Sequence, residues 1–248
     1  MAGAFTYNGI DMSAYSLTVT GHNAEDYSEV IETIQTKNRS YISGEYMPPR
    51  SLMLDVVIYG TSIADLKTKL DNVVKVLRTG AESHLVLDGD PSRLYKARFK
   101  GKSKRELWGN INWTGTLEFA CPDPLAYSTT ETFSNHAIDA DPKIATETVG
   151  GTTFTRPVWT LTAGETLTDV IIKLENQITG EELQWTGSLN SADTLEIDCR
   201  YWTVKKNGAS SMTISGSFPR LAVGANPIKV TGLSTTGSLN IRYRTAYI

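Results

Sequence analysis

One segment of this 248-residue chain has the hydrophobic periodicity of an α-helix. Between Ser62 and Arg78 the apolar residues recur at steps of three and four positions, which places them on one face of a helix. They are Ile63, Leu66, Leu70, Val73, Val74 and Leu77. Ser62 suits the N-cap, and Gly80 suits the left-handed residue that ends a helix. The pattern therefore predicts one amphipathic helix over residues 62–78, packed by one side against a sheet.

The rest of the N-terminal half has the patterns of β-strands. Residues 51–59 are apolar and β-branched, whereas residues 94–99 and 112–119 alternate between apolar and polar positions. Residues 29–36 fit either a helix or a strand, and their β-branched content favours a strand. We therefore predict an α+β N-terminal domain over residues 1–128.

The composition of the chain changes after Pro124. Residues 128–153 are rich in Ser, Thr, Asp, Gly and Ala, so we predict a connector over residues 129–151 with a short extended strand near Phe133. Beyond it, short apolar segments follow one another at intervals of about ten residues, separated by Gly and Asn, which is typical of a β-sandwich. The predicted fold class is thus mainly β, with an all-β sandwich over residues 152–248.

Composition and charge exclude several classes of protein. Hydrophobic residues make up 40% of the chain and the net charge is only −3, so we expect folded domains and not a disordered chain. The same balance argues against a protein that coats DNA through a basic stripe. Cys121 and Cys199 lie too far apart for a disulfide framework. We see no secretory signal and no apolar run near the roughly 20 residues of a membrane-spanning helix.

No motif in the sequence predicts catalysis, a metal site or a cofactor. Gly-rich phosphate loops, the HExxH zinc motif and the G-x-S-x-G nucleophile motif are absent. His22, His84 and His136 lie in separate segments without metal-ligand spacing. Asp88-Gly89-Asp90 resembles a metal-binding pair of carboxylates, but the glycine and the following proline fit a turn better. We therefore predict that the protein is not an enzyme and needs no cofactor.

Aromatic residues in the C-terminal half leave one binding function open. Trp159 and Trp185 lie in predicted strands, where such side chains most often fill the core. Tyr201 and Trp202 are neighbours, so on a strand one of them faces inward and the other outward. The outward ring would be a platform on which a sugar ring of a cell-wall glycan could stack. Glycan binding through Tyr201 and Trp202 is therefore the alternative function.

The segment from residue 41 to residue 49 (YISGEYMPP) combines aromatic residues, a methionine and two prolines without strong periodicity. A loop with exposed residues of this kind is a candidate for a partner-binding arm. An equally simple interpretation is a loop folded over its own domain. The residues at issue are Tyr41, Tyr46, Met47, Pro48 and Pro49.

An ordered series of short motifs resembles one protein family. In the N-terminal half these are FTYNGID at residues 5–11, the strand and helix at residues 52–78, LDGDPSRLY at 87–95 and CPDPLAY at 121–127. In the C-terminal half they are LEID at residues 195–198, VKKNG at 204–208, FPRL at 218–221, GANPI at 224–228 and IRYRTAY at 241–247. Each motif alone is weak, but their order along nearly the whole chain resembles the distal tail (Dit) proteins of long-tailed, non-contractile bacteriophages.

The resemblance implies a structural role at the phage tail tip. Proteins of this family form a ring of six around a central channel, with a belt that embraces the neighbouring subunit and a galectin-like C-terminal sandwich. The belt is expected within residues 29–49. Some relatives carry an inserted carbohydrate-binding module, for which 248 residues leave no room. The implied location is the virion tail tip, after assembly in the host cytoplasm.

The resemblance also implies the partners of the protein. Besides further copies of itself, they are the tail tube protein, the tail-associated lysin or tail fibre hub protein, and receptor-binding or baseplate proteins. DNA is expected only in transit through the channel, and no membrane insertion is expected. Because phosphates bind lysine-rich walls, we also expect the loops that face the channel to be poor in Lys and Arg.

Overall fold

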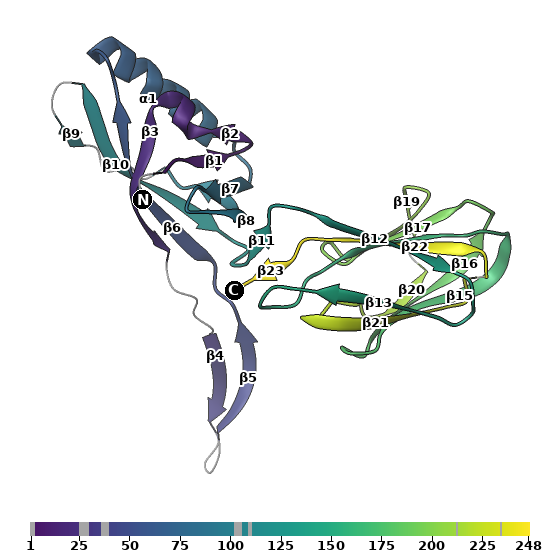
Figure 1. Cartoon of the computed structure of the whole chain (residues 1–248). Helices are drawn as coiled ribbons and strands as arrows, with labels where there is room; N and C mark the ends of the chain where they lie inside the picture. The colour runs from purple at the N-terminus through teal and green to yellow at the C-terminus, as the bar shows by residue number, and fades with distance from the viewer. Residues whose placement is uncertain are drawn as a thin grey trace. The chain divides into compact units, whose positions relative to one another are not determined.

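The computed structural model describes residues 3–24, 30–35, 40–101, 106–108, 111–211, 213–233 and 235–248; for residues 23–24, 30–35, 40–46 and 106–108 it describes the backbone alone. The chain forms two compact units, unit 1 (Met1–Thr129 with Ile248) and unit 2 (Thr130–Tyr247) (Figure 1). Both units consist mainly of antiparallel strands, and the described residues contain one α-helix. The predicted mainly β fold class is therefore confirmed, while the galectin-like character of the sandwich stays a prediction.

Unit 1 is built around one antiparallel sheet with the strand order β2-β1-β7-β8-β10-β6-β3, in which β9 adds to β10 and β11 to β8. A short 3₁₀ helix (Met12–Tyr15) precedes β3. The strands are β1 (Phe5–Tyr7), β2 (Ile10–Asp11), β3 (Leu17–Ala24), β6 (Arg50–Tyr59), β7 (Ser83–Leu87), β8 (Asp90–Phe99), β9 (Glu106–Trp108), β10 (Asn112–Cys121) and β11 (Ala126–Ser128). The central strands β6 and β10 pair along their whole length, from Arg50 opposite Cys121 to Tyr59 opposite Asn112.

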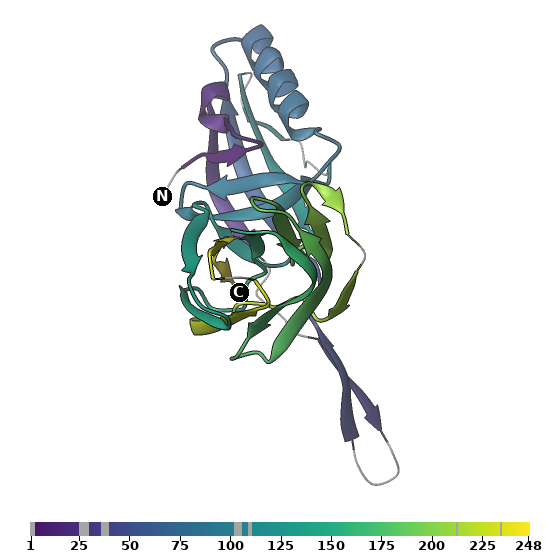
Figure 2. The same cartoon turned by 90° about the vertical axis from the view of Figure 1, so that its right-hand side faces the viewer.

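The helix α1 (Ile63–Leu77) covers one face of this sheet (Figure 2). The Ser62 Oγ accepts a hydrogen bond from the Asp65 amide at 3.1 Å, which is the N-cap that the sequence predicts. Leu66, Val73 and Leu77 are buried with the inward residues of β6 in one apolar core. Ile63 and Val74, at the edge of the predicted stripe, are exposed. The buried stripe is therefore narrower than the apolar stripe in the sequence.

The strands β4 (Val30–Gln35) and β5 (Ser40–Tyr46) form a two-stranded sheet of their own. They lie between β3 and β6, whose paired ends are Ala24 and Leu52. Figure 1 shows this hairpin beyond the ends of β3 and β6. In the described part of the chain β4 and β5 pair only with each other.

Unit 2 is a sandwich of two antiparallel sheets, with strand orders β12-β22-β14-β17-β18-β19 and β13-β21-β15-β16-β20. The strands are β12 (Thr132–Ile138), β13 (Lys143–Val149), β14 (Val158–Thr162), β15 (Leu167–Asn176), β16 (Glu181–Leu189), β17 (Thr194–Asp198), β18 (Thr203–Lys206), β19 (Ala209–Ser210), β20 (Ile214–Gly216), β21 (Gly224–Thr231) and β22 (Gly237–Tyr243). The terminal strand β23 (Ala246–Tyr247) belongs to neither sheet of the sandwich. Trp159 and Trp185 are buried between the sheets, as predicted for strand tryptophans.

The segment predicted as a connector differs from the prediction. Residues 129–151 contain β12 and β13, which pair along their length with β22 and β21 and so belong to unit 2. The inward positions of β13 are Ala145, Glu147 and Val149, and those of β12 include Ser134 and His136. Small and polar residues at inward positions hide the alternation that marks a strand. The boundary between the units therefore lies at Thr129, and unit 2 begins earlier than the predicted residue 152.

A buried amide holds the turn before β21. The Asn226 side chain is fully buried; its Oδ1 accepts from the Ala222 amide at 2.8 Å, and its Nδ2 donates to the Ala222 and Gly224 carbonyls at 2.8 and 2.9 Å. Asn176, also fully buried, donates to the same Oδ1 at 3.0 Å. Removing this amide takes a hydrogen-bond partner from partly buried backbone groups of Ala222 and Gly224 and from the buried Asn176 side chain.

We expect Asn226→Ala to lower the free energy of unfolding of unit 2 by about 3 kcal/mol, because each buried polar group left unpaired costs about 1–3 kcal/mol. Urea unfolding followed by tryptophan fluorescence measures the change. Asn240→Ala is the matched control, since Asn240 is exposed on β22 and should cost less than about 0.5 kcal/mol. Equal effects of the two substitutions would contradict this role of Asn226.

Both cysteines are buried and free. Burial raises the pKa of the Cys121 thiol to about 12 and that of the Cys199 thiol to about 12. Since the thiolate is the reactive form, we expect neither residue to react with iodoacetamide at about pH 8 until the chain is unfolded in urea. Mass spectrometry counts the added groups, and modification of the folded protein would show that the burial is incomplete.

Candidate functional site

The part of the chain that the structure describes contains no group of three or more potential metal ligands. Asp88 and Gly89 form the turn between β7 and β8. The Asp90 carboxylate accepts a hydrogen bond from Ser92 at 2.6 Å, and the Asp88 carboxylate accepts one from the amide of Ala4, just before β1, also at 2.6 Å. The turn interpretation of this motif is therefore confirmed. Within the described residues, no helix has the length and apolar character needed to cross a membrane.

One polar cluster in unit 2 contains residue types found in catalytic sites. The Glu147 carboxylate, 7% exposed, accepts hydrogen bonds from Ser134 at 2.7 Å and Tyr243 at 2.9 Å, and His136 Nε2 lies 3.4 Å from it. Burial and the neighbouring Glu147 raise the pKa of Tyr243. Ser134 donates to the carboxylate and not to the imidazole, so the cluster lacks the hydroxyl-to-base contact of an activated nucleophile. It joins strands β12 and β22 of one sheet to β13 of the other.

The segment predicted as an arm is mostly strand. Tyr41 and Tyr46 lie in β5, whereas Met47, Pro48 and Pro49 link β5 to β6. The side chains of Tyr41 and Tyr46 lie outside the described part of the structure. A two-stranded hairpin by itself is only marginally stable in water, because it buries little apolar surface. The predicted arm is therefore a two-stranded hairpin with a linker, and its role as an arm stays a prediction.

The face of the sheet that points away from α1 is the second candidate. Along β6, buried residues that face the helix alternate with outward residues, which are Met53, Asp55, Val57 and Tyr59. With Thr20 of β3 and Thr114 and Thr116 of β10, these four residues form what we call the uncovered face. This face was not predicted, because residues 52–59 form an almost continuous apolar run in which Asp55 is the one charged position. The alternation of buried and outward residues is visible only in the structure.

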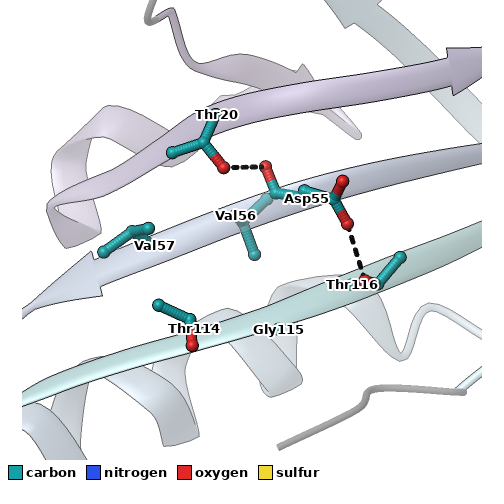
Figure 3. Close-up of a pocket in the computed structure, with 7 residues that line it drawn as sticks. All are labelled: Thr20, Asp55, Val56, Val57, Thr114, Gly115 and Thr116. Carbon is teal, nitrogen blue, oxygen red and sulfur yellow. Dashed lines mark hydrogen bonds between the residues drawn. The ribbon is translucent and has the colours of Figure 1, made fainter. Parts of the chain in front are cut away.

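A hollow of about 270 Å³ lies on the uncovered face, around Asp55 (Figure 3). Thr116 donates a hydrogen bond to the Asp55 carboxylate at 2.7 Å, and Thr20 donates to the Asp55 carbonyl at 3.2 Å. The residues that line the hollow include one acid and neither Lys nor Arg. The hollow thus combines threonine hydroxyls with a negative charge.

Tyr201 and Trp202 are placed differently from the prediction. They lie in the turn between β17 and β18, not on a strand, and both side chains are exposed, at 72% and 61%. The prediction that one ring faces inward is therefore wrong. The turn spans residues 199–202, since Asp198 already pairs with Thr203. Whether either ring binds a glycan stays a prediction.

Comparisons with known proteins agree on one family. Residues 150–247 match the family model described as "Siphovirus-type tail component, C-terminal domain". The chain is 25% identical over 212 residues to the distal tail protein of Bacillus phage SPP1, covering 83% of this chain and 81% of that protein.

Two solved structures show the same fold. The crystal structure of the SPP1 Dit protein matches with a TM-score of 0.77 at 18% identity, over 97% of this chain and 98% of that chain. That protein is described as a paradigm of the hub adsorption apparatus in phages that infect Gram-positive bacteria. A chain of the phage p2 baseplate in its activated conformation with Ca matches with a TM-score of 0.53 at 9% identity, over 98% of both chains. Residues 150–247 thus match the C-terminal domain of siphovirus-type tail components, and the chain as a whole is similar in sequence and fold to the siphophage distal tail (Dit) proteins.

Proposed function

We propose that this chain is a structural hub of a phage tail tip, in which six copies form a ring at the end of the tail tube. Unit 1 builds the ring around a channel for DNA, and unit 2 holds other proteins of the tip. The chain performs no chemical reaction and needs no cofactor. The similarity to Dit proteins supports this function, as do the adsorption apparatus and the baseplate to which the similar solved structures belong.

The β4–β5 hairpin carries the proposal. It forms a separate two-stranded sheet, and a hairpin of this size gains stability by packing on another surface. In a closed ring of identical subunits the same contact is repeated at every interface, and an exchanged arm enlarges it. The hairpin, with the linker Met47, Pro48 and Pro49, is thus the intersubunit arm of the ring, and the next copy supplies the surface.

The uncovered face suits the wall of the channel. Phosphates bind strongly to walls rich in Lys and Arg, and such binding would delay the passage of DNA. The hollow on this face is lined by Asp55 and threonines, without a basic side chain. With α1 on the other face of the sheet, the uncovered face is free to line the channel. The expectation that channel-facing segments are poor in basic residues is therefore extended to this sheet face.

The proposed partners follow from a place at the tail tip. The ring joins the tail tube protein to the tail-associated lysin or tail fibre hub protein, and unit 2 supports receptor-binding or baseplate proteins. The chain assembles in the host cytoplasm without insertion into a membrane. DNA contacts it only during transit.

Glycan recognition through Tyr201 and Trp202 is the second candidate function. The exposure of both rings favours it, because stacking on a sugar requires an accessible aromatic face. Titration of the protein with cell-wall glycans, followed by tryptophan fluorescence, tests it. A change that Trp202→Ala abolishes would support glycan binding.

Electron microscopy of phage tail tips tests the hub function. We expect six copies of this chain in a ring at the end of the tail tube, with the uncovered face toward the channel. Particles without the chain should lack a correctly formed tip. Infectious particles with a normal tip in the absence of the chain would refute the proposal.

A further inference from the structure

Arginine and aromatic side chains alternate along one surface of unit 2. The Arg156 guanidinium lies 5.0 Å from the centre of the Trp202 ring and 5.9 Å from that of Phe154. Arg220 lies 4.6 Å from the centre of the same Phe154 ring. Stacking of this kind holds a guanidinium flat against a ring and leaves its edge directed outward.

A second pair extends this surface, since Arg200 lies 5.7 Å from the centre of the Tyr201 ring. Together Phe154, Arg156, Arg200, Tyr201, Trp202 and Arg220 form what we call the arginine–aromatic surface. Its residues come from the strand-free segment before β14, from the turn between β17 and β18, and from the segment before β21.

Carboxylates neutralise two of the three arginines. Arg200 donates to both oxygens of Asp198, at 3.0 and 2.7 Å. Arg220 donates to Glu181 through its Nε and through its backbone amide, each at 2.8 Å. Arg156 has no carboxylate within ion-pair distance among the residues that the structure describes. The N–H groups of the Arg156 guanidinium can therefore form a pair of hydrogen bonds with a carboxylate from outside the unit.

Trp202 is presented to solvent by an unusual backbone. Its φ of 52° lies in the left-handed region, which bulky residues rarely adopt. The side chain gains little burial in exchange, because 61% of it is exposed. Strained conformations of this kind occur preferentially where a side chain takes part in binding. Trp202 and the still more exposed Tyr201 therefore point to recognition and not to packing.

We propose that the arginine–aromatic surface docks a protein partner that presents an Asp or Glu carboxylate to Arg156 and an apolar pocket to Trp202. Trp, Tyr and Arg are the residues that dominate the energetics of protein interfaces. The two rings project from a turn, whereas sites for small molecules are concave. The inference rests on the proposed hub function, because a hub must hold other proteins. It identifies the chemistry by which unit 2 holds one of them.

Photo-cross-linking in assembled phage particles tests the docking surface. The full chain carries p-benzoylphenylalanine in place of Tyr201, and mass spectrometry identifies the cross-linked peptide after irradiation. We expect a cross-link to a different polypeptide, next to an Asp or Glu. Arg156→Glu should lower the yield about tenfold or more, because it sets two carboxylates against each other. Replacing the partner's carboxylate by Arg should restore the yield in the Arg156→Glu chain.

The controls separate docking from ring formation. The same photoprobe at Ile171, exposed at 49% on β15, should give no cross-link that depends on Arg156. Arg156→Glu should leave the six-copy ring intact. If the ring persists but the Tyr201 probe labels no protein, or labels a host glycan, docking is refuted and the hub function stands. If no ring exists at the tip, the hub function itself has failed.

Discussion

Replacing residues 27–49 by Asn-Gly is expected to release the ring into single, folded chains. The design removes the β4–β5 hairpin and its linker but keeps the β3–β6 ladder, in which Ala24 faces Leu52. Two residues suffice to join antiparallel strands at that distance, and Asn-Gly favours the required turn. Because the proposed arm would supply a repeated contact of the proposed ring, its loss should reduce the particle mass about sixfold in light scattering.

A second variant tests the contribution of the arm's side chains while the backbone of the hairpin is kept. Tyr41→Ser with Tyr46→Ser keeps the length of the hairpin and removes both rings. Tyrosines at protein interfaces contribute about 2 kcal/mol each, so under the proposed arm function the concentration at which the ring dissociates should rise about a thousandfold. Tyr59→Ser is the matched control, since it removes an exposed tyrosine from the uncovered face. Rings that form normally without the hairpin would show that it is not the intersubunit arm.

The sequence predicted best those elements that local chemistry specifies. Ser62 caps α1 where expected. Asn-Gly is a pair that favours a two-residue hairpin turn, and Asn207-Gly208, with φ values of 48° and 80°, closes the β18–β19 hairpin, where Lys206 pairs with Ala209. In both cases a few neighbouring residues determine the backbone, so no distant contact can override the pattern. The tryptophans at the centre of the sandwich were predictable for a related reason, because large apolar rings in strands are buried wherever they can be.

Features that depend on distant contacts were not predictable in the same way. The segment of β12 and β13 was predicted as a connector because polar residues, among them Ser134, His136 and Glu147, occupy inward positions of these strands. The burial of these residues depends on the hydrogen bonds that they form with one another. Tyr201 and Trp202 are residue types that are common in strands, but they lie in a turn. The ladder between β17 and β18 ends at the pair of Asp198 and Thr203, so the residues between them connect the two strands. The site residues share this difficulty. Arg156 becomes notable only when Trp202, far along the chain, is placed beside it.

Positive charge on the uncovered face is expected to slow the ejection of DNA. The variant Thr20→Lys, Asp55→Asn, Thr116→Lys raises the charge of each chain by three units around one hollow. Each phosphate contact adds a salt-dependent term to the affinity for DNA, so a ring of such chains should hold the passing duplex. We expect ejection at about 50 mM salt to be about tenfold slower than normal, with recovery at about 200 mM salt, where phosphate contacts weaken.

The salt dependence identifies the cause of this delay. A channel narrowed or misfolded by the substitutions would eject DNA slowly at every salt concentration, whereas electrostatic retention disappears as salt screens the phosphates. Thr68→Lys is the control, because Thr68 is exposed on α1, on the opposite side of the sheet. It adds a lysine without placing it in the channel, so ejection should remain normal. If the triple variant ejects DNA at the normal rate in low salt, the uncovered face does not line the channel, and the arm of a neighbouring copy becomes the better candidate to cover it.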